Sequence, residues 1–413
     1  MGENASRAER MRADALAQRV HGGSARSLGL ADEHGARPPH VLDFSVNVNP
    51  LGPSPRAVDA ARQALAHIDA YPDRESRALT RALAASYGVP AESIVCGAGA
   101  SDLICRLAAA LRPRRAIVCA PTFSEYAEAA TRFGADVQEV PLSEEDGFDV
   151  PCAFARAIAG PGDVAFLCSP NNPTGRLIAP DVLTAVADRC EKTGALLVVD
   201  ECFLGFSPDA ASRSLAVRAG SSRHVAVLSA FTKFYGMAGL RLGYLICGNA
   251  DILEGVRAVG QIWPVSSVAE AAGAAALLDT DYLARTRRVV ESERAWLARE
   301  LSALGLSVVP SSANYLLFRA PESDLGKRLY ERGILVRTCA SFSGLSSFWY
   351  RVAVRTRKEN ETLVCALARV LEDACACKLG EGAPASTAAP EAQGAADAQR
   401  AAHRITKEAD ANG

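Results

Sequence analysis

Short apolar runs alternate with helix-like stretches over the first two thirds of the chain. The apolar runs predict strands at residues 94–96, 116–119, 137–141, 164–168, 195–199, 225–228 and 242–247. Helical patterns lie between them, among others at residues 101–111, 125–132 and 179–192. This alternation predicts βαβ units, and therefore an α/β fold whose mainly parallel sheet carries helices on both faces.

The pattern changes after about residue 261. One long helical pattern covers residues 268–304 with a break near Thr280, and shorter helical patterns lie at 323–332 and 358–375. Strand patterns fall at 306–309, 315–319, 335–337 and 350–354. We therefore expect an N-terminal arm at 1–40, a large domain at 41–265, a small α+β domain at 266–375 and a disordered tail at 376–413, which lacks a sustained apolar stripe.

Composition narrows the class of protein. The 413 residues carry a net charge of −2 and no long basic run, so we expect no nucleic-acid partner. No segment predicts a transmembrane helix or a signal peptide, which favours a cytoplasmic protein with no membrane partner. Several of the 12 cysteines lie inside apolar runs, where a reduced thiol packs as a small hydrophobe. Cys375 and Cys377 form a weak metal or redox motif, and we expect no metal site.

Three polar residues follow predicted strands of the sheet. Asn172 lies just beyond one strand, Asp200 ends the next, and Lys233 follows a third by a few residues. Ligands in open α/β sheets bind beyond the carboxyl ends of the strands, so these side chains are candidates for a single site. Lys233 stands among apolar and aromatic residues. Its stem could pack there while the ammonium reaches water, or burial could favour a neutral, nucleophilic amine.

These three groups match the needs of pyridoxal phosphate. An aldehyde can condense with Lys233, Asp200 can keep a pyridine nitrogen protonated, and Asn172 can donate to a phenolic oxygen. The cofactor's phosphate needs donors, and GAGASD at residues 97–102 supplies small residues at a strand–helix junction. Further donors are available from Ser229, Thr232 and Arg241.

The segments SPNNPTG, VVDECF and SAFTKFYGMAGLRLGY resemble the signatures of fold-type I pyridoxal-phosphate enzymes in the aspartate aminotransferase superfamily, over roughly residues 40–370. The resemblance implies a Schiff base on Lys233, Asp200 on the pyridine nitrogen and Asn172 on the phenolic oxygen. It assigns ring stacking to Phe123 and phosphate binding to a larger set: Ala100, Ser101, Ser229, Arg241 and, from the second subunit of a homodimer with shared active sites, Tyr71.

One residue departs from that pattern, and some assignments have a structural alternative. Phe203 occupies a position where many relatives have a tyrosine that bonds the phenolic oxygen. Taken alone, Asp200 could be a helix cap, Ser229 a turn residue and Phe123 part of the core. The order of the asparagine, aspartate, lysine and arginine along the chain is what favours the cofactor interpretation.

Three arginines near the C-terminal end predict an anionic substrate. Arg351 and Arg355 are four residues apart on a predicted strand and so would share a face, and Arg337 precedes them. A single carboxylate needs one bidentate arginine, so the group suggests a second anion such as a phosphate. Arg355 could instead be a solvated arginine.

The N-terminal segments HGG and DFSVNVNPLGPS are similar to those of the threonine-phosphate decarboxylases of cobalamin biosynthesis, more than to the related histidinol-phosphate aminotransferases. The resemblance implies decarboxylation of L-threonine O-3-phosphate to (R)-1-amino-2-propanol O-2-phosphate. Transfer of an amino group from histidinol phosphate is the alternative, and a non-catalytic ligand-sensing domain is a remote one. The substrate-binding candidates are His21, Gly22, Asn47, Asn172, Arg337, Arg351 and Arg355.

Overall fold

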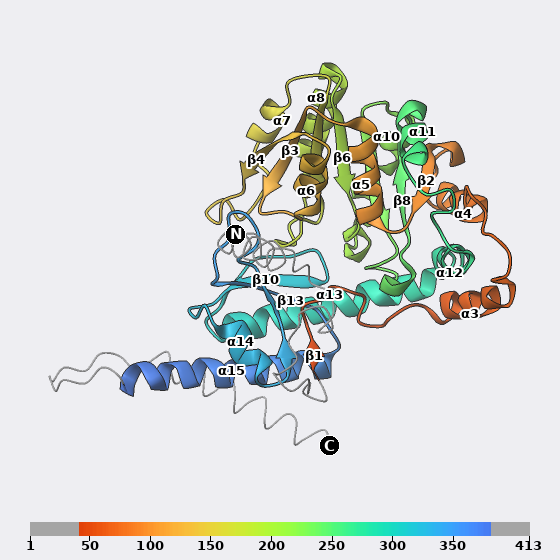
Figure 1. The fold of residues 1–413 in the computed structure, drawn as a ribbon. Helices are drawn as coiled ribbons and strands as arrows, with labels where there is room; N and C mark the ends of the chain where they lie inside the picture. The colour runs from red at the N-terminus through yellow and green to blue at the C-terminus, as the bar shows by residue number, and fades with distance from the viewer. Residues whose placement is uncertain (1–40, 381–413) are drawn as a thin grey trace, which may run out of the picture.

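A seven-stranded sheet forms the centre of the upper part of the molecule in Figure 1, a computed structural model that describes residues 41–380. The strands follow the order β2 (Ile94–Gly97), β8 (Gly243–Ile246), β7 (Val225–Ala230), β6 (Leu196–Asp200), β5 (Asp163–Cys168), β3 (Arg115–Ala120) and β4 (Asp136–Pro141). Only β8 runs antiparallel to its neighbours. The predicted α/β fold with a mainly parallel sheet is confirmed, and each predicted strand of this sheet overlaps an observed one.

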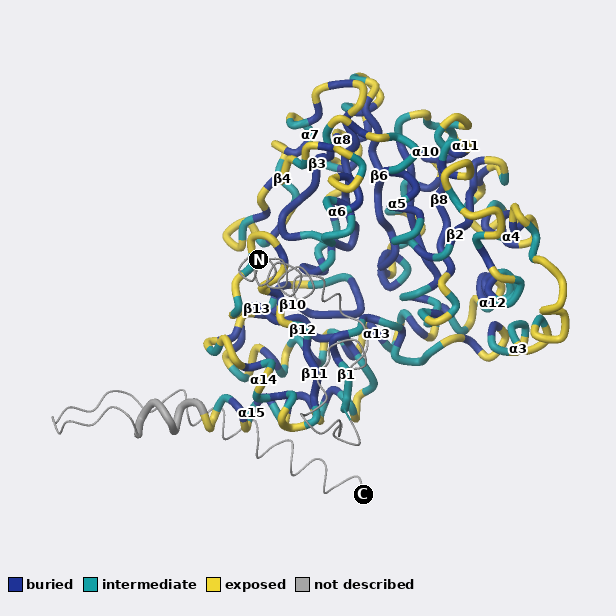
Figure 2. Tube along the Cα trace, in the orientation of Figure 1, coloured by how far each residue is buried: buried dark blue, intermediate teal, exposed yellow. Residues whose placement is uncertain are grey.

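Helices cover both faces of this sheet, because its central strands are apolar on both sides (Figure 2). On β6, Leu196 and Val198 pack with one layer of helices, while Leu197 and Val199 pack with the other. The first layer contains α5 (Ala100–Leu111), α6 (Glu125–Arg132) and α11 (Ala250–Ala258). The second contains α4 (Arg77–Tyr87), α7 (Ala153–Ala157), α8 (Pro180–Thr193), α10 (Ala216–Ser221) and α12 (Ser267–Leu277).

A four-stranded antiparallel sheet lies below the large one in Figure 1. Its order is β12 (Arg337–Thr338), β13 (Trp349–Ala353), β10 (Tyr315–Arg319) and β9 (Ser307–Val308). The helices α13 (Thr280–Ala303), α14 (Leu325–Tyr330) and α15 (Arg357–Gly380) belong to this part. The predicted break near Thr280 is confirmed, since α12 and α13 are separate helices.

The strand predicted at 335–337 is two short strands in different sheets. Strand β11 (Ile334–Leu335) pairs in parallel with β1 (Leu42–Asp43), whereas β12 joins the four-stranded sheet. The sequence pattern also did not yield α3 (Pro55–Ala64), whose start is set by Ser54: its hydroxyl accepts from the Ala57 N–H, and Pro55 fills the first turn. The remaining short helices are α9 (Ala210–Arg213), η1 (Leu65–His67), η2 (Ala91–Ser93), η3 (Leu204–Phe206) and η4 (Ala238–Leu240).

The segment that follows β1 contacts both sheets in turn. The Ala353 N–H donates to the Phe44 carbonyl (2.8 Å), which attaches the start of the segment to β13. Further along, the Asn49 N–H donates to the Lys233 carbonyl (3.0 Å), and the Asn49 amide donates to the Phe234 carbonyl (3.0 Å). One extended stretch of backbone therefore connects the small sheet to the loop after β7. Between residues 41 and 380, no helix has the length and apolar character needed to cross a membrane.

Candidate active site

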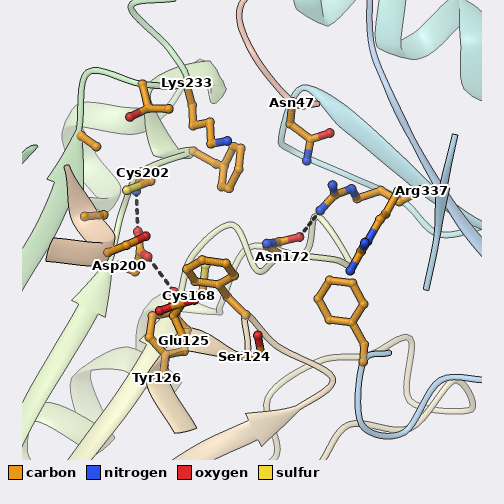
Figure 3. Close-up of a pocket in the computed structure, with 18 of the residues that line it drawn as sticks. Asn47, Ser124, Glu125, Tyr126, Cys168, Asn172, Asp200, Cys202, Lys233 and Arg337 are labelled. Carbon is orange, nitrogen blue, oxygen red and sulfur yellow. Dashed lines mark hydrogen bonds between the residues drawn. The ribbon is translucent and has the colours of Figure 1, made fainter. Parts of the chain in front are cut away.

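A cavity of about 590 Å³ lies where the carboxyl ends of the large sheet's strands face the small sheet. Side chains from both parts line it, and Figure 3 shows Lys233, Asp200 and Asn172 facing the same space, with Arg337 across from Asp200. The predicted site residues that line the cavity are Asn47, Ala100, Ser101, Phe123, Asn172, Asp200, Thr232, Lys233, Arg241, Arg337 and Arg351. The structure therefore brings most of the predicted site residues, which come from distant segments of the chain, into one cavity.

Lys233 is half-buried in the loop after β7, at the wall of the cavity. Burial, and to a lesser extent the positive charge of Arg351, lower the pKa of its amine from 10.5 to about 8. The Phe203 ring lies 5.8 Å from the Lys233 nitrogen and packs edge-on against Tyr315. A sizeable fraction of the amine is thus neutral near pH 8, which is the form that attacks an aldehyde.

Asp200 ends β6 and is held by two donors. The Tyr126 hydroxyl donates to one carboxylate oxygen (2.6 Å), and the Cys202 N–H donates to the other (2.9 Å). Burial, together with the charge of Asp200, raises the pKa of Tyr126 well above its usual value, so the phenol remains a donor. Tyr126 also stacks on Phe166 (5.4 Å between ring centroids). The carboxylate is therefore fixed in orientation and presented to the cavity.

Sequence reasoning missed Tyr126. Its only signal was a position three residues after Phe123, in the helix that follows β3. Within α6 the buried positions are Tyr126, Ala129 and Ala130, a spacing that reads as ordinary core packing. The ring of Phe123 contacts Tyr126 edge-on, with 5.6 Å between centroids, and itself faces the cavity. The aromatic pair thus joins the wall of the site to the group that holds Asp200.

Arg351 determines how Asn172 is oriented. Its guanidinium donates to the Asn172 amide oxygen, and to the Ser45 carbonyl at 3.0 Å. The Asn47 amide oxygen, in the orientation that satisfies both groups, accepts from Arg351 Nη1 (3.3 Å) and Nε (3.2 Å). Because the Asn172 oxygen is engaged, its amide nitrogen points the other way, toward the centre of the cavity (Figure 3). The asparagine is therefore a donor toward any group bound between Lys233 and Asp200.

A second guanidinium, that of Arg337, lies beside Arg351 on the small-sheet side of the cavity. Its Nη2 donates to the Ser341 hydroxyl (2.9 Å), and its centre lies 5.7 Å from the Phe342 ring. Burial lowers the pKa of Arg337, and the neighbouring charge of Arg351 lowers it as well. Two cations held this close together favour anionic ligands, which offset their mutual repulsion.

The N-terminus of α5 opens into the cavity as a small cup formed by Ala100, Ser101, Thr232 and Arg241, which we call the phosphate cup. Gly99 caps the helix at φ +95°, and a Cβ there would lie 2.8 Å from Arg241 Nη2. A Cβ on Gly243 would lie 2.9 Å from the Ala100 nitrogen. Both glycines are thus needed for the close approach of Arg241 and β8 to the helix end, where unpaired N–H groups attract anions.

Three of the predicted site residues that the structure describes, Ser229, Arg355 and Tyr71, lie outside this cavity. Ser229 is adjacent to Ala230 on β7, and successive strand residues point to opposite faces. Ala230 lines both this cavity and a separate one, whereas Ser229 lines only the separate one, with Tyr87 and Tyr244. The structure therefore does not bring Ser229 to the phosphate cup; Thr232, on the loop beyond the strand, is the hydroxyl that lies there.

Arg355 is also elsewhere, because β13 ends at Ala353 and the alternation of the strand does not extend to it. Its guanidinium donates to the Asp43 carbonyl (3.0 Å) and to Glu359 (2.5 Å). The strand expected to carry Arg355 ends two residues earlier, and Arg355 does not join Arg351 at the cavity, because its half-exposed guanidinium is paired with Glu359. Arg355 is a structural residue that joins β1 to the start of α15.

Tyr71 projects away from the cavity of its own chain. Its side chain is 79% exposed and stacks on Trp263, with ring centroids 4.3 Å apart. A role for Tyr71 in the site of a second subunit stays a prediction. His21 and Gly22 lie outside the described residues, as do the side chains of Cys375 and Cys377.

The arrangement fits pyridoxal phosphate. A nucleophilic amine, a fixed carboxylate and an oriented amide donor surround one space, and a cup for an anion lies at its edge. The glycines that would clash with a Cβ keep that cup open, and Phe123 offers an aromatic face. When bound, pyridoxal phosphate supplies an aldehyde for condensation with an amine and a protonated ring that withdraws electrons from the amino acid's Cα.

Comparisons with known proteins match most of the described residues. The family model "Aminotransferase class I and II" matches residues 39–367. The threonine-phosphate decarboxylase of Salmonella typhimurium is 38% identical over 86% of this chain and 98% of its own length. The histidinol-phosphate aminotransferase of Symbiobacterium thermophilum is 38% identical over 84% of this chain and 92% of its own. The crystal structure of the histidinol-phosphate aminotransferase of Clostridium acetobutylicum superimposes with a TM-score of 0.74, at 26% identity, over 81% of this chain and 100% of that one.

Proposed function

Since this chain belongs to the class I and II aminotransferase family, whose enzymes depend on pyridoxal phosphate, we propose that it decarboxylates L-threonine O-3-phosphate to (R)-1-amino-2-propanol O-2-phosphate. The observation that carries the proposal is the pair Arg337 and Arg351 in one cavity with Lys233. A phosphorylated amino acid carries two anions, a carboxylate and a phosphate, and two adjacent guanidinium groups match them. The similarity to a threonine-phosphate decarboxylase over 98% of that enzyme's length supports the same substrate. A cytoplasmic role in cobalamin biosynthesis is part of the proposal.

In this proposal, some residues of the site bind the cofactor and substrate, and others transfer protons. Lys233 would hold the cofactor in the resting enzyme, and its amine, once freed, would be placed to return a proton to the substrate's Cα. Asp200 keeps the pyridine nitrogen protonated, and Tyr126 keeps Asp200 in place. Arg351 and Arg337 would hold the substrate's two anions, with His21 assisting, and so orient its carboxylate for cleavage from Cα. This orientation selects loss of carbon dioxide over loss of the Cα proton.

Histidinol-phosphate aminotransferase is the second candidate, because an equally identical relative has that activity. Histidinol phosphate has a phosphate but no carboxylate, although glutamate, the usual amino donor, has two carboxylates. The two guanidinium groups alone do not separate these reactions, and a substrate assay does.

We expect purified holoenzyme to release carbon dioxide from threonine phosphate in step with aminopropanol phosphate and without a keto acid. Headspace carbon dioxide and product mass are the measurements. Threonine without the phosphate is the matched control; it lacks one anion, and its kcat/KM should be lower by about a hundredfold or more. Rapid formation of glutamate from histidinol phosphate and 2-oxoglutarate would identify an aminotransferase, provided that threonine phosphate is inert. If neither pair reacts and no cofactor binds, the non-catalytic alternative stands.

The proposal includes a homodimer in which Tyr71 reaches the phosphate cup of the second subunit. Support comes from a set of exposed apolar side chains: Leu65, Ile68, Tyr71, Val259, Ile262, Trp263 and Leu278. Such exposure is typical of an interaction surface. The expected boundary near residue 265 precedes α12, which packs with the large sheet, so we propose that the large domain ends after α12, before α13 begins at Thr280.

Sedimentation of the wild type at micromolar concentration should therefore give a dimer. Tyr71→Phe keeps the ring and loses the hydroxyl, so the dimer should persist while the cofactor's dissociation constant rises up to about tenfold. Tyr71→Ala also removes the stack on Trp263 and should weaken the dimer. A fully active wild-type monomer would contradict the shared site.

A further inference from the structure

An acidic residue follows the phosphate cup in the same helix. Asp102 lies in the first turn of α5, directly after Ala100 and Ser101. A carboxylate there stabilises the helix dipole, yet it also repels an anion that binds at the same helix end. Asp102 points back along the chain, and its Oδ2 accepts from the Ala98 N–H at 2.8 Å. The carboxylate thus fixes the loop before the helix at the cost of a negative charge close to the cup.

Arg106 neutralises that charge from the next turn of the helix. Its Nε donates to Asp102 Oδ1 (2.9 Å), and its Nη2 lies 2.8 Å from Oδ2, so both carboxylate oxygens are engaged. The Arg106 side chain is 8% exposed and that of Asp102 is 26% exposed, unlike the pair of Arg62 and Asp59, in which both side chains are more than half exposed. Bidentate geometry and burial make this pair stronger than a surface ion pair.

The chain at Gly260, just after α11, packs against the Arg106 guanidinium from outside the helix. A Cβ on Gly260 would clash with Arg106 Nη1, so a larger residue there would require the guanidinium to shift. Arg106 lines a cavity on that side of the helix and not the one that contains Lys233. The arginine therefore lies outside the cavity that contains Lys233, and its contact with Asp102 is what connects it to the phosphate cup.

We propose that Asp102 and Arg106 are positioning residues for the cofactor phosphate. Asp102 holds the loop 97–100 through its hydrogen bond with the Ala98 N–H, but it places a negative charge near the cup. Arg106 neutralises that charge, so that Asp102 does not weaken the attraction of the helix N-terminus and Arg241 for the phosphate. The proposal rests on pyridoxal phosphate being the cofactor but not on which reaction follows. It predicts a charge-specific effect, because removing the arginine exposes the phosphate to Asp102, whereas removing both charges does not.

The test is absorbance titration of apoenzyme with pyridoxal phosphate, which measures binding without turnover. Arg106→Met should raise the dissociation constant about tenfold, as expected for an uncompensated unit charge near the cup. The double variant Asp102→Asn with Arg106→Met should return to within about threefold of wild type, because asparagine still accepts from Ala98 and carries no charge. The loss in Arg106→Met should shrink between low and high salt. Arg213→Met, in another pair four residues apart on α9, is the matched control and should bind normally.

Two results would overturn the proposal. One is a double variant as weak as Arg106→Met; the other is a loss in Arg106→Met that does not depend on salt. Either would mean that Arg106 acts through packing. If Arg106→Met does not fold, Arg106→Lys preserves the charge and should bind within about threefold of wild type; Arg106→Lys binding tenfold more weakly at a normal melting temperature would also contradict the proposal. Failure of the wild type to bind pyridoxal phosphate would instead refute the proposed function.

Discussion

Lys233→Ala should lower the rate of carbon dioxide release by about 10³–10⁴-fold, because one amine provides both the covalent attachment and the proton transfer. Borohydride treatment of wild-type holoenzyme should fix the cofactor on Lys233, and peptide mass should locate it there. The alanine variant should retain cofactor non-covalently and remain unlabelled. Labelling of a different lysine in the wild type would refute the central assignment.

The same lysine should also destabilise the folded apoenzyme. Its pKa is about 8 in the folded state and 10.5 when unperturbed, so the unfolded chain binds the extra proton between these values. The resulting loss of folding stability is fully present below pH 8 and decreases as the pH rises toward 10.5. Lys233→Met should therefore stabilise the apoenzyme by roughly 1–3 kcal/mol at pH 7 and by little at pH 10.5. Thermal unfolding across this range measures the difference.

Arg351→Ala should reduce kcat/KM for threonine phosphate by about a hundredfold, since a charge-assisted anion contact is lost and Asn172 loses the group that orients it. Arg351→Lys keeps the charge without the planar fork and should recover only part of the activity. The cofactor should remain bound in both variants, as its absorbance would show.

Arg355→Ala provides the control, because Arg355 contacts Glu359 and the Asp43 carbonyl and not the cavity. It should lower the melting temperature more than it lowers kcat/KM. An equal loss of kcat/KM in the Arg351 and Arg355 variants would show that the substrate site extends to Arg355.

The sequence predicted the large sheet and the centre of the site for the same reason. In parallel βαβ units the carboxyl ends of the strands share an edge, so Asn172, Asp200 and Lys233 could be brought together before any side chain was placed. Their chain order, together with the match in motif, supplied the chemistry.

What the sequence could not predict depends on one-residue details. Ser229 and Ala230 face opposite sides of β7, so an error of one position moves a hydroxyl to the wrong cavity. Arg355 was placed on a strand that ends two residues earlier. Tyr126 occupies a helix position typical of core packing, and only the three-dimensional structure shows that its hydroxyl donates to Asp200. Such contacts are set by packing between distant segments, which local patterns do not encode.

The backbone between β1 and α3 sets a limit on how this protein can vary. The Ser45 carbonyl accepts from Arg351, the proposed anion-binding residue, and the Asn49 N–H donates to the Lys233 carbonyl. These two contacts are four residues apart along the chain. Side chains at 46 and 48 can change without altering that separation, whereas an added or missing residue alters it by up to about 3.5 Å. Homologues that share this site should therefore tolerate substitutions in this segment but no insertions or deletions. When the segment is transferred to a related protein, preserving its length should matter more than preserving its side chains.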